Sequence, residues 1–294
     1  MTVSEQARPL AVARPSLWQR LRDAMAPVLA SKVALVGLAL VMFWILAAIF
    51  APVLTPYTPL EQDADAMNLG PSAKHPLGAD HLGRDLWARL VYGSRLILVL
   101  APLSVLCSLA VGTTFGLMAG YFGGLLDEVV MRVLDAMMAF PAILLYLIII
   151  AAVGASAMNV VIAITVAGAP GIARLVRSLT MDIRTREYIA AAQLRGENPF
   201  YIMWVEILPN ARGPIIVDAM LRVGYAVFSI GTLGFLGLGL PPPTPDWGSM
   251  VCAGRRYIWS NPWTVLWPSL AISSLVVGLN LFADGLREET MRYQ

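Results

Sequence analysis

Two histidines and two nearby carboxylates are the first side chains in this sequence that could bind a metal ion. His75 and His81 lie close to Asp80 and Asp85, and imidazole and carboxylate groups are common metal ligands. The surrounding segment is rich in proline and glycine, which indicates a loop between apolar stretches. These residues could form a metal site or belong to a structural loop, and we expect the loop.

Two sequence patterns would indicate enzymatic activity, namely a serine motif inside the membrane and a phosphate-binding loop. Ser156, in the segment Gly-Ala-Ser-Ala, is similar to the serine motif of intramembrane proteases. Such an enzyme needs a histidine base in a neighbouring span, and neither histidine lies in one. The sequence contains no GxxxxGK[ST] segment, so any ATP hydrolysis must belong to another polypeptide. We therefore expect a non-catalytic chain that binds no cofactor of its own.

Asp218 and Arg222 are charged residues inside an apolar stretch. Four residues apart on a helix, they share one face in the order that favours attraction. Ionisable groups inside a membrane span usually face the interior of the bundle or a wet cavity. The pair is either a structural ion pair or part of a path through the membrane.

A polar segment, residues 184–212, separates two apolar stretches and has the pattern of two short helices. Good helix formers run from Arg186 to about Arg195 and include three consecutive alanines, which allow another backbone to approach closely. Gly196 is expected to end this helix. Asn198 followed by Pro199 then predicts an N-cap and a second helix.

The second helix is expected to carry an apolar stripe. Phe200, Met203, Trp204 and Ile207 recur at i, i+3, i+4 and i+7. We expect the residues Leu208, Pro209 and Asn210 to end this helix before the next span. A membrane protein places charged residues where water or another protein meets it, so residues 184–212 are interpreted as a docking surface.

This segment resembles the EAA loop of ABC importer permeases, the cytoplasmic element that couples the membrane subunit to its ATPase. The resemblance rests on Glu187, on Ala191 with Ala192 and Gly196, and on residues 207–209. The glutamate that names the loop is replaced by Ala190, and a common histidine by Glu206. The residues that the resemblance assigns to ATPase coupling are Glu187, Ala191, Ala192, Gly196, Phe200, Met203, Trp204, Leu208 and Pro209.

Three further segments resemble the C-type permease subunit of dipeptide and oligopeptide importers. They are residues 75–85, which contain His-Pro-Leu-Gly, residues 233–248 and residues 280–287. The first explains His75 without a metal. In this family a basic residue at Arg222 is familiar but an aspartate at position 218 is not. On a translocation path, Arg222 could meet a peptide carboxylate.

The composition indicates a polytopic membrane protein. Of the 294 residues, 58% are hydrophobic and 14% are charged, whereas a soluble domain has about 25% charged residues. The net charge of +2 gives no support for nucleic-acid binding. Cys107 and Cys252 lie far apart, and we expect both to be unpaired.

Six segments are apolar enough to span a bilayer, whose core of about 30 Å requires roughly 20 residues of helix. They are residues 33–54, 96–120, 136–154, 160–172 with their flanks, 214–240 and 263–282. The fourth is interrupted by Gly168, Pro170 and Gly171. Between the first two spans, we expect residues 86–95 to form a separate helix in the membrane interface.

The distribution of basic residues predicts the orientation. With the N-terminus inside, fourteen lysines and arginines lie on the cytoplasmic face and six on the other. Both termini and residues 184–212 are then cytoplasmic. The expected divisions are a cytoplasmic N-terminal segment (1–31), a first span with an outer loop and an interfacial helix (32–95), a core permease domain (96–287) and a cytoplasmic tail (288–294).

The resemblance implies an all-α membrane protein with the type I ABC importer permease fold, in the bacterial cytoplasmic membrane. The expected partners are a second, non-identical permease subunit, two ABC ATPases that hold ATP and Mg, and an extracytoplasmic substrate-binding protein. Di- and oligopeptides are the expected cargo, with glutathione or nickel chelates as alternatives. A secondary transporter is a less favoured alternative, because the spans contain few acidic residues and no histidine.

Overall fold

The computed structural model describes residues 31–292, which form helices and no strands. The predicted N-terminal segment lies almost entirely outside this range. The helices are α2 (Lys32–Ile49), α3 (Ala51–Leu54), α4 (Leu86–Phe122), α5 (Gly124–Met138), α6 (Ala142–Val153), α7 (Ala157–Arg184), α8 (Glu187–Leu194), α9 (Pro199–Tyr201), α10 (Leu208–Phe235), α11 (Trp247–Gly254) and α12 (Trp263–Arg292). Short helical turns lie at η1 (Ala64–Ala66), η2 (Ile202–Ile207) and η3 (Arg255–Tyr257).

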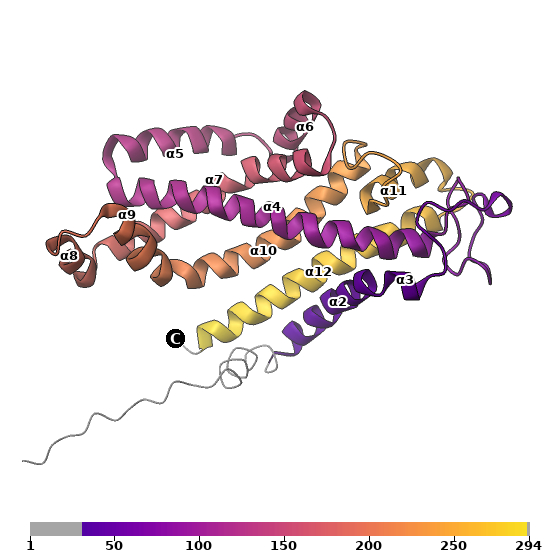
Figure 1. Cartoon of the computed structure of the whole chain (residues 1–294), viewed down its shortest axis with the longest axis horizontal. Coiled ribbons are helices and arrows are strands. Elements are labelled where there is room, and N and C mark those ends of the chain that lie inside the picture. The colour runs from indigo at the N-terminus through magenta and orange to yellow at the C-terminus, as the bar shows by residue number, and fades with distance from the viewer. Residues whose placement is uncertain (1–30, 293–294) are drawn as a thin grey trace, which may run out of the picture.

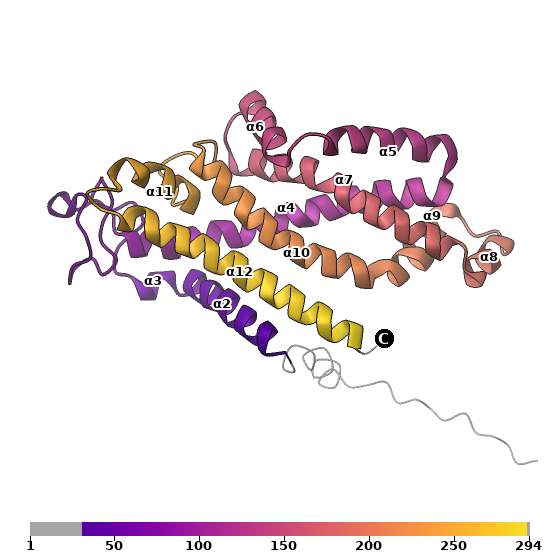
Figure 2. The ribbon, with the colours of Figure 1, turned by 180° about the vertical axis from the view of Figure 1, so that it is seen from behind.

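The long helices run roughly along one axis of the molecule (Figures 1 and 2). Helices α8 and α9 lie at one end, which we call the α8 end. The loop between α3 and α4 lies at the opposite end with α11 (Figure 1). In the described residues, five helices are long and apolar enough to cross a membrane, and α5 with α6 makes a sixth if the bent pair counts as one span. The structure therefore agrees with the expected six spans only if the bent pair α5 and α6 is counted as one broken span, and otherwise has five.

The third predicted span is not a single helix. Helices α5 and α6 meet at an angle of 90°, and the break falls at residues 139–141, where Pro141 precedes the first residue of α6. Proline disfavours the helical conformation in the residue before it, which here is Phe140. The first span is also shorter than predicted, since α2 ends at Ile49 and α3 follows after Phe50.

The expectation of a separate interfacial helix over residues 86–95 was wrong. These residues are the first turns of α4, which runs for 37 residues from an N-cap on Asp85. Arg89, which such a helix would have turned to water, is buried instead, whereas Arg95 is exposed. The predicted interruption of the fourth span is also absent, because α7 is continuous through Pro170.

A stripe of glycines lets α4 pack closely on α7. Gly112, Gly116 and Gly120 recur every four residues on α4, and a Cβ atom at each would lie 2.6–2.7 Å from atoms of α7. Small residues at this spacing allow helix backbones to approach in a membrane, where packing replaces the hydrophobic effect as the force between helices. Gly37 on α2 and Gly278 on α12 join a second pair of helices in the same way.

Replacing Gly116 by leucine is expected to lower the free energy of unfolding by about 1–3 kcal/mol, the usual cost of overpacking. A Cβ atom there would lie 2.6 Å from the carbonyl oxygen of Ala173. Thermal unfolding in detergent, followed by size-exclusion chromatography, measures the effect. Gly213→Leu is the matched control, because nothing lies within 4 Å of a Cβ at that position. Equal losses in the two variants would contradict the packing argument.

Candidate functional site

The polar segment between α7 and α10 lies at the α8 end and contains α8, α9 and the π turn η2 (Figure 1). We call residues 187–207 the α8–η2 element. Helix α8 ends as predicted at Gly196, whose φ of +76° is accessible to glycine at low cost. The N–H of Glu197 donates to the Ala192 carbonyl, and that of Gly196 to the Gln193 carbonyl. These two bonds form a Schellman motif, which satisfies the last carbonyls of the helix.

The second helix starts as predicted but does not stop where predicted. The Asn198 side chain accepts a hydrogen bond from the N–H of Phe200 at 2.9 Å, and Pro199 is the first helical residue. Helix α9 then runs through the π-helical turn η2 into α10 without a break. Pro209 has no N–H to donate, and the wider π turn, in which Leu208 donates to the Met203 carbonyl, carries the chain past it. The expected end at residues 208–210 was wrong.

Burial divides the predicted coupling residues into two groups. Ala192 and Met203 are 0% and 1% exposed, and they pack in a core cluster with Ile189, Ile202 and Ile207 beneath α4 and α7. These two side chains hold the element to the bundle and offer no surface to a partner. Leu208 is half-buried, and the others are exposed, namely Glu187, Ala191, Gly196, Phe200, Trp204 and Pro209.

The exposed surface of the element contains large apolar side chains that the sequence pattern missed. Leu194 is 90% exposed, and Tyr188, Tyr201 and Val205 are 41–49% exposed. Together with Phe200 and Trp204 they form what we call the end patch. Residues 200–208 are apolar on nearly every side, so the helical spacing alone could not tell the buried stripe from the exposed one.

Two ion pairs lie at the two ends of helix α8. Arg186 donates to Asp182 at 2.9 Å, and this hydrogen bond raises the pKa of Arg186. Arg195 lies 3.5 Å from Glu197 across the turn. Three of these four side chains are at least 57% exposed and Glu197 is 35% exposed, so the pairs contribute little to stability.

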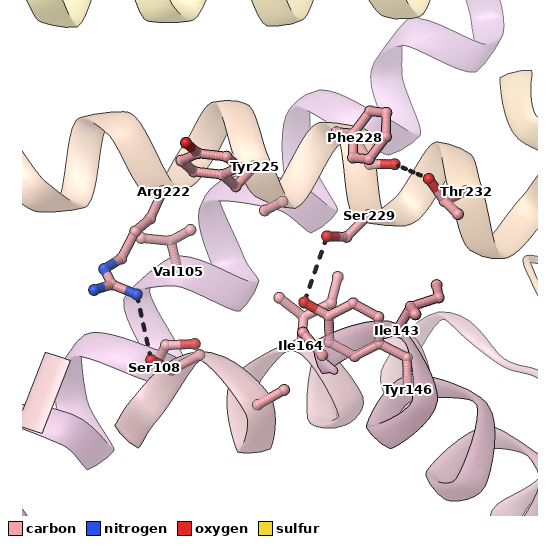
Figure 3. A pocket seen from close by; sticks show the side chains of 14 residues that line it. Val105, Ser108, Ile143, Tyr146, Ile164, Arg222, Tyr225, Phe228, Ser229 and Thr232 are labelled. Carbon is pink, nitrogen blue, oxygen red and sulfur yellow. Dashed lines mark hydrogen bonds between the residues drawn. The ribbon is translucent and has the colours of Figure 1, made fainter. Parts of the chain in front are cut away.

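The second predicted site lies at a cavity of about 550 Å³ between α4, α6, α7 and α10 (Figure 3). Arg222 lines it near the middle of α10 and forms the predicted ion pair with Asp218. The Nη1 atom of Arg222 also lies 3.5 Å from the Gly168 carbonyl oxygen on α7. The side chains of Arg222 and Asp218 are 27% and 29% exposed, so the pair is half-buried at the cavity wall.

His75 and its neighbours form a structural cluster in the loop opposite the α8 end. His75 is 2% exposed, with its Nδ1 atom 2.9 Å from the Asp85 carboxylate and its Nε2 atom 3.4 Å from Asp63. The Lys74 ammonium lowers the pKa of Asp63. Burial lowers the pKa of His81, which stacks on Tyr257. Between residues 31 and 292, no group of three or more His, Cys, Asp or Glu could hold a metal.

These features define the class of the protein as a polytopic helical membrane protein with a partly exposed helical element between two spans. Residues 112–288 match the family model of the binding-protein-dependent transport system inner membrane component. Residues 16–71 match that of the N-terminal transmembrane domain of oligopeptide transport permease C. The chain therefore belongs to the family of binding-protein-dependent transport system inner membrane components and is an ABC importer permease.

Relatives extend the likeness over almost the whole sequence. The chain is 42% identical to the dipeptide transport system permease protein DppC of Alkalihalophilus pseudofirmus, with 97% of each chain covered. It is 40% identical to the di/tripeptide permease DppC of Pseudomonas aeruginosa, covering 88% of this chain and 87% of that one. It is also 40% identical to the glutathione permease GsiD of Pectobacterium atrosepticum, covering 84% and 83%.

A solved structure confirms the predicted fold. This chain is similar to a chain of the MetNI methionine ABC transporter in an inward-facing conformation, with a TM-score of 0.55 and 23% identity. The match covers 69% of this chain and 97% of that chain. The architecture is that of a type I ABC importer permease.

Replacing Gly196 by alanine is expected to loosen the end of α8, because a residue with a Cβ atom is disfavoured at the φ of +76° found here. The cost of about 1–2 kcal/mol corresponds to roughly a fivefold to thirtyfold increase in amide exchange over the last turn of α8. Hydrogen–deuterium exchange with mass spectrometry measures it. The control Gly213→Ala, in the regular helix α10, is expected not to raise exchange. Unchanged exchange in Gly196→Ala would contradict the assigned role of the turn.

Proposed function

We propose that this chain is one of two permease subunits in an ATP-driven importer of di- and oligopeptides. Its family and its relatives named as dipeptide permeases support this class of cargo. The ATPases, which bind ATP and Mg, are separate polypeptides, and an extracytoplasmic binding protein delivers the peptide. The second permease is a non-identical subunit.

The observation that carries the coupling proposal is the end patch. Soluble ATPases have to contact the membrane subunit outside the bilayer, and the α8–η2 element lies at the very end of the bundle (Figure 1). Trp204 and Phe200 are 45% and 57% exposed there, and aromatic residues are the usual anchors of protein interfaces. Glu187, Ala191, Gly196 and Pro209 complete the surface, while Ala192, Met203 and Leu208 support it from within.

The orientation follows from the same proposal. In the sequence, fourteen lysines and arginines fall on the side assigned to the α8–η2 element and six on the other, and the positive-inside rule assigns the richer side to the cytoplasm. The N-terminus and the tail are cytoplasmic in this arrangement, and the chain lies in the bacterial inner membrane. The cavity beside Asp218 and Arg222 is then about halfway along α10, where a translocation path would pass. This subunit contributes one wall of that path.

Replacing Trp204 by aspartate is expected to abolish ATP-dependent peptide uptake while the protein still inserts. A charged residue at the centre of an apolar contact removes an interface anchor, which commonly costs about 2 kcal/mol or more, roughly a thirtyfold loss of affinity. Uptake into vesicles and co-purification of the ATPases measure the two effects. Trp204→Phe, which keeps an aromatic ring, is the matched control and is expected to retain most activity. Gly196→Arg should act like Trp204→Asp, and uptake that persists with both changes would refute the coupling role.

Glutathione is the second candidate cargo, because a glutathione permease is 40% identical to this chain. If peptides are the cargo, membrane vesicles that contain the complete transporter are expected to accumulate a labelled dipeptide, and excess unlabelled dipeptide should compete more strongly than excess glutathione. The reverse order of competition would favour glutathione. Uptake that continues without the ATPases would favour a secondary transporter instead.

A further inference from the structure

A polar stripe follows one face of the transmembrane helix α10. Asp218, Arg222, Tyr225, Ser229 and Thr232 are spaced at i, i+4, i+7, i+11 and i+14, so they lie on one face of the helix. The last four line the cavity of about 550 Å³ (Figure 3). A structural ion pair would need only the first two residues. The hydroxyl groups of Tyr225, Ser229 and Thr232 continue the stripe. That of Thr232 donates to the Phe228 carbonyl at 2.9 Å, and each hydroxyl oxygen keeps an acceptor site with which a polar solute can bond.

The wall opposite the stripe is mostly apolar. Val105, Ile143 and Ile164 contribute aliphatic side chains from α4, α6 and α7 (Figure 3). Two hydroxyl groups interrupt this wall. That of Tyr146 lies 3.4 Å from the Ser229 hydroxyl across the cavity, and that of Ser108 donates to the Ser104 carbonyl of its own helix at 2.8 Å. A cavity with one polar and one apolar wall matches a short peptide, whose backbone is polar and whose side chains are often apolar. Its volume is within the usual range for ligand pockets, about 300–1,000 Å³.

Arg222 supplies a positive charge at one end of the stripe. Its Nε atom donates to Asp218, and its Nη1 atom lies at the long distance of 3.5 Å from the Gly168 carbonyl. The guanidinium lies over Gly171, where a Cβ atom would be 3.1 Å from its Nη2 atom. A guanidinium has five N–H donors, and these contacts leave donors for a second carboxylate.

Resting on the proposed function, we propose that this cavity is a transient subsite that recognises the free C-terminal carboxylate of the peptide in transit. The carboxylate binds Arg222, and the peptide backbone lies along Tyr225, Ser229 and Thr232. Asp218 competes with the carboxylate for Arg222, which keeps the affinity low and lets the cargo leave. The subsite therefore favours peptides with a free C-terminus over their amides.

Protection of a cysteine in the cavity tests this subsite without the binding protein or ATP. In the purified transporter with Cys107 and Cys252 replaced by alanine, Ser229→Cys is labelled by a water-soluble thiol reagent. A dipeptide is expected to slow this labelling. The C-terminal amide of the same dipeptide should need at least about tenfold more for equal protection, because it lacks a charge-assisted hydrogen bond. Met158→Cys, exposed on α7 outside the cavity lining, is the control and should not be protected.

Two charge variants separate recognition from a structural role. Arg222→Gln is expected to make the dipeptide and its amide equally weak protectors, whereas Asp218→Asn should lower the dipeptide concentration needed for half-protection. If Arg222→Gln alone does not fold, the double variant Asp218→Asn with Arg222→Gln, which removes both charges, takes its place in the assay. Three results with Arg222 in place would refute the subsite: no labelling of the thiol of Ser229→Cys, no protection by either peptide, or equal protection by the dipeptide and its amide. A preference for the free acid that survives in Arg222→Gln would also refute it. Normal ATP-dependent uptake in the unsubstituted transporter alongside any of these results would leave the proposed function intact.

Discussion

Close packing between α4 and α7 is the contact on which the rest of the molecule depends. Three glycines on α4 face the carbonyls and side chains of α7, so the two helices meet almost backbone to backbone. The contact between α4 and α7 supports two parts of the protein. At the α8 end, these helices carry the core cluster under the α8–η2 element. Farther along, they form two walls of the cavity. A displacement along the seam would disturb both sites at once.

Charged and polar groups in this protein are placed in three different environments. The cluster around His75 is buried and paired within a loop. The pairs near α8 are exposed to solvent, where they are worth little. Asp218 and Arg222 lie between these extremes, half-buried at a cavity wall. A charge of intermediate exposure can be neutralised by a partner and still be reached by a solute. Asp127 and Arg177, 17% and 30% exposed, share this environment, but Arg222 is the one that lines the cavity between α4, α6, α7 and α10.

Sequence reasoning found the features that depend on local chemistry. Asn198 with Pro199 and the glycine at position 196 fix the ends of short helices, and the structure has both as predicted. The predictions from sequence were wrong where tertiary contacts determine the structure. Pro170 and Pro209 were expected to interrupt helices, but packing and a π turn carry the chain through them. The repeated glycines of α4 went unnoticed because their partner, α7, is distant in sequence. The apolar stripe of residues 200–207 did not reveal which of its members would be buried.

The continuous helical segment from Pro199 to Phe235 connects the end patch mechanically to the cavity. Trp204 at the end patch and Arg222 at the cavity belong to one continuous helical segment and are 18 residues apart. The segment changes direction between α9 and α10 (Figures 1 and 2), and its α-helical part from Leu208 to Arg222 spans about 21 Å. A tilt of this part by about 10° at Leu208 would shift Arg222 by roughly 4 Å. A displacement at the α8 end would thus reach the wall of the cavity through α10, because the helical segment that joins the two positions is continuous. The π turn of this segment, Ile202–Ile207, contains Trp204.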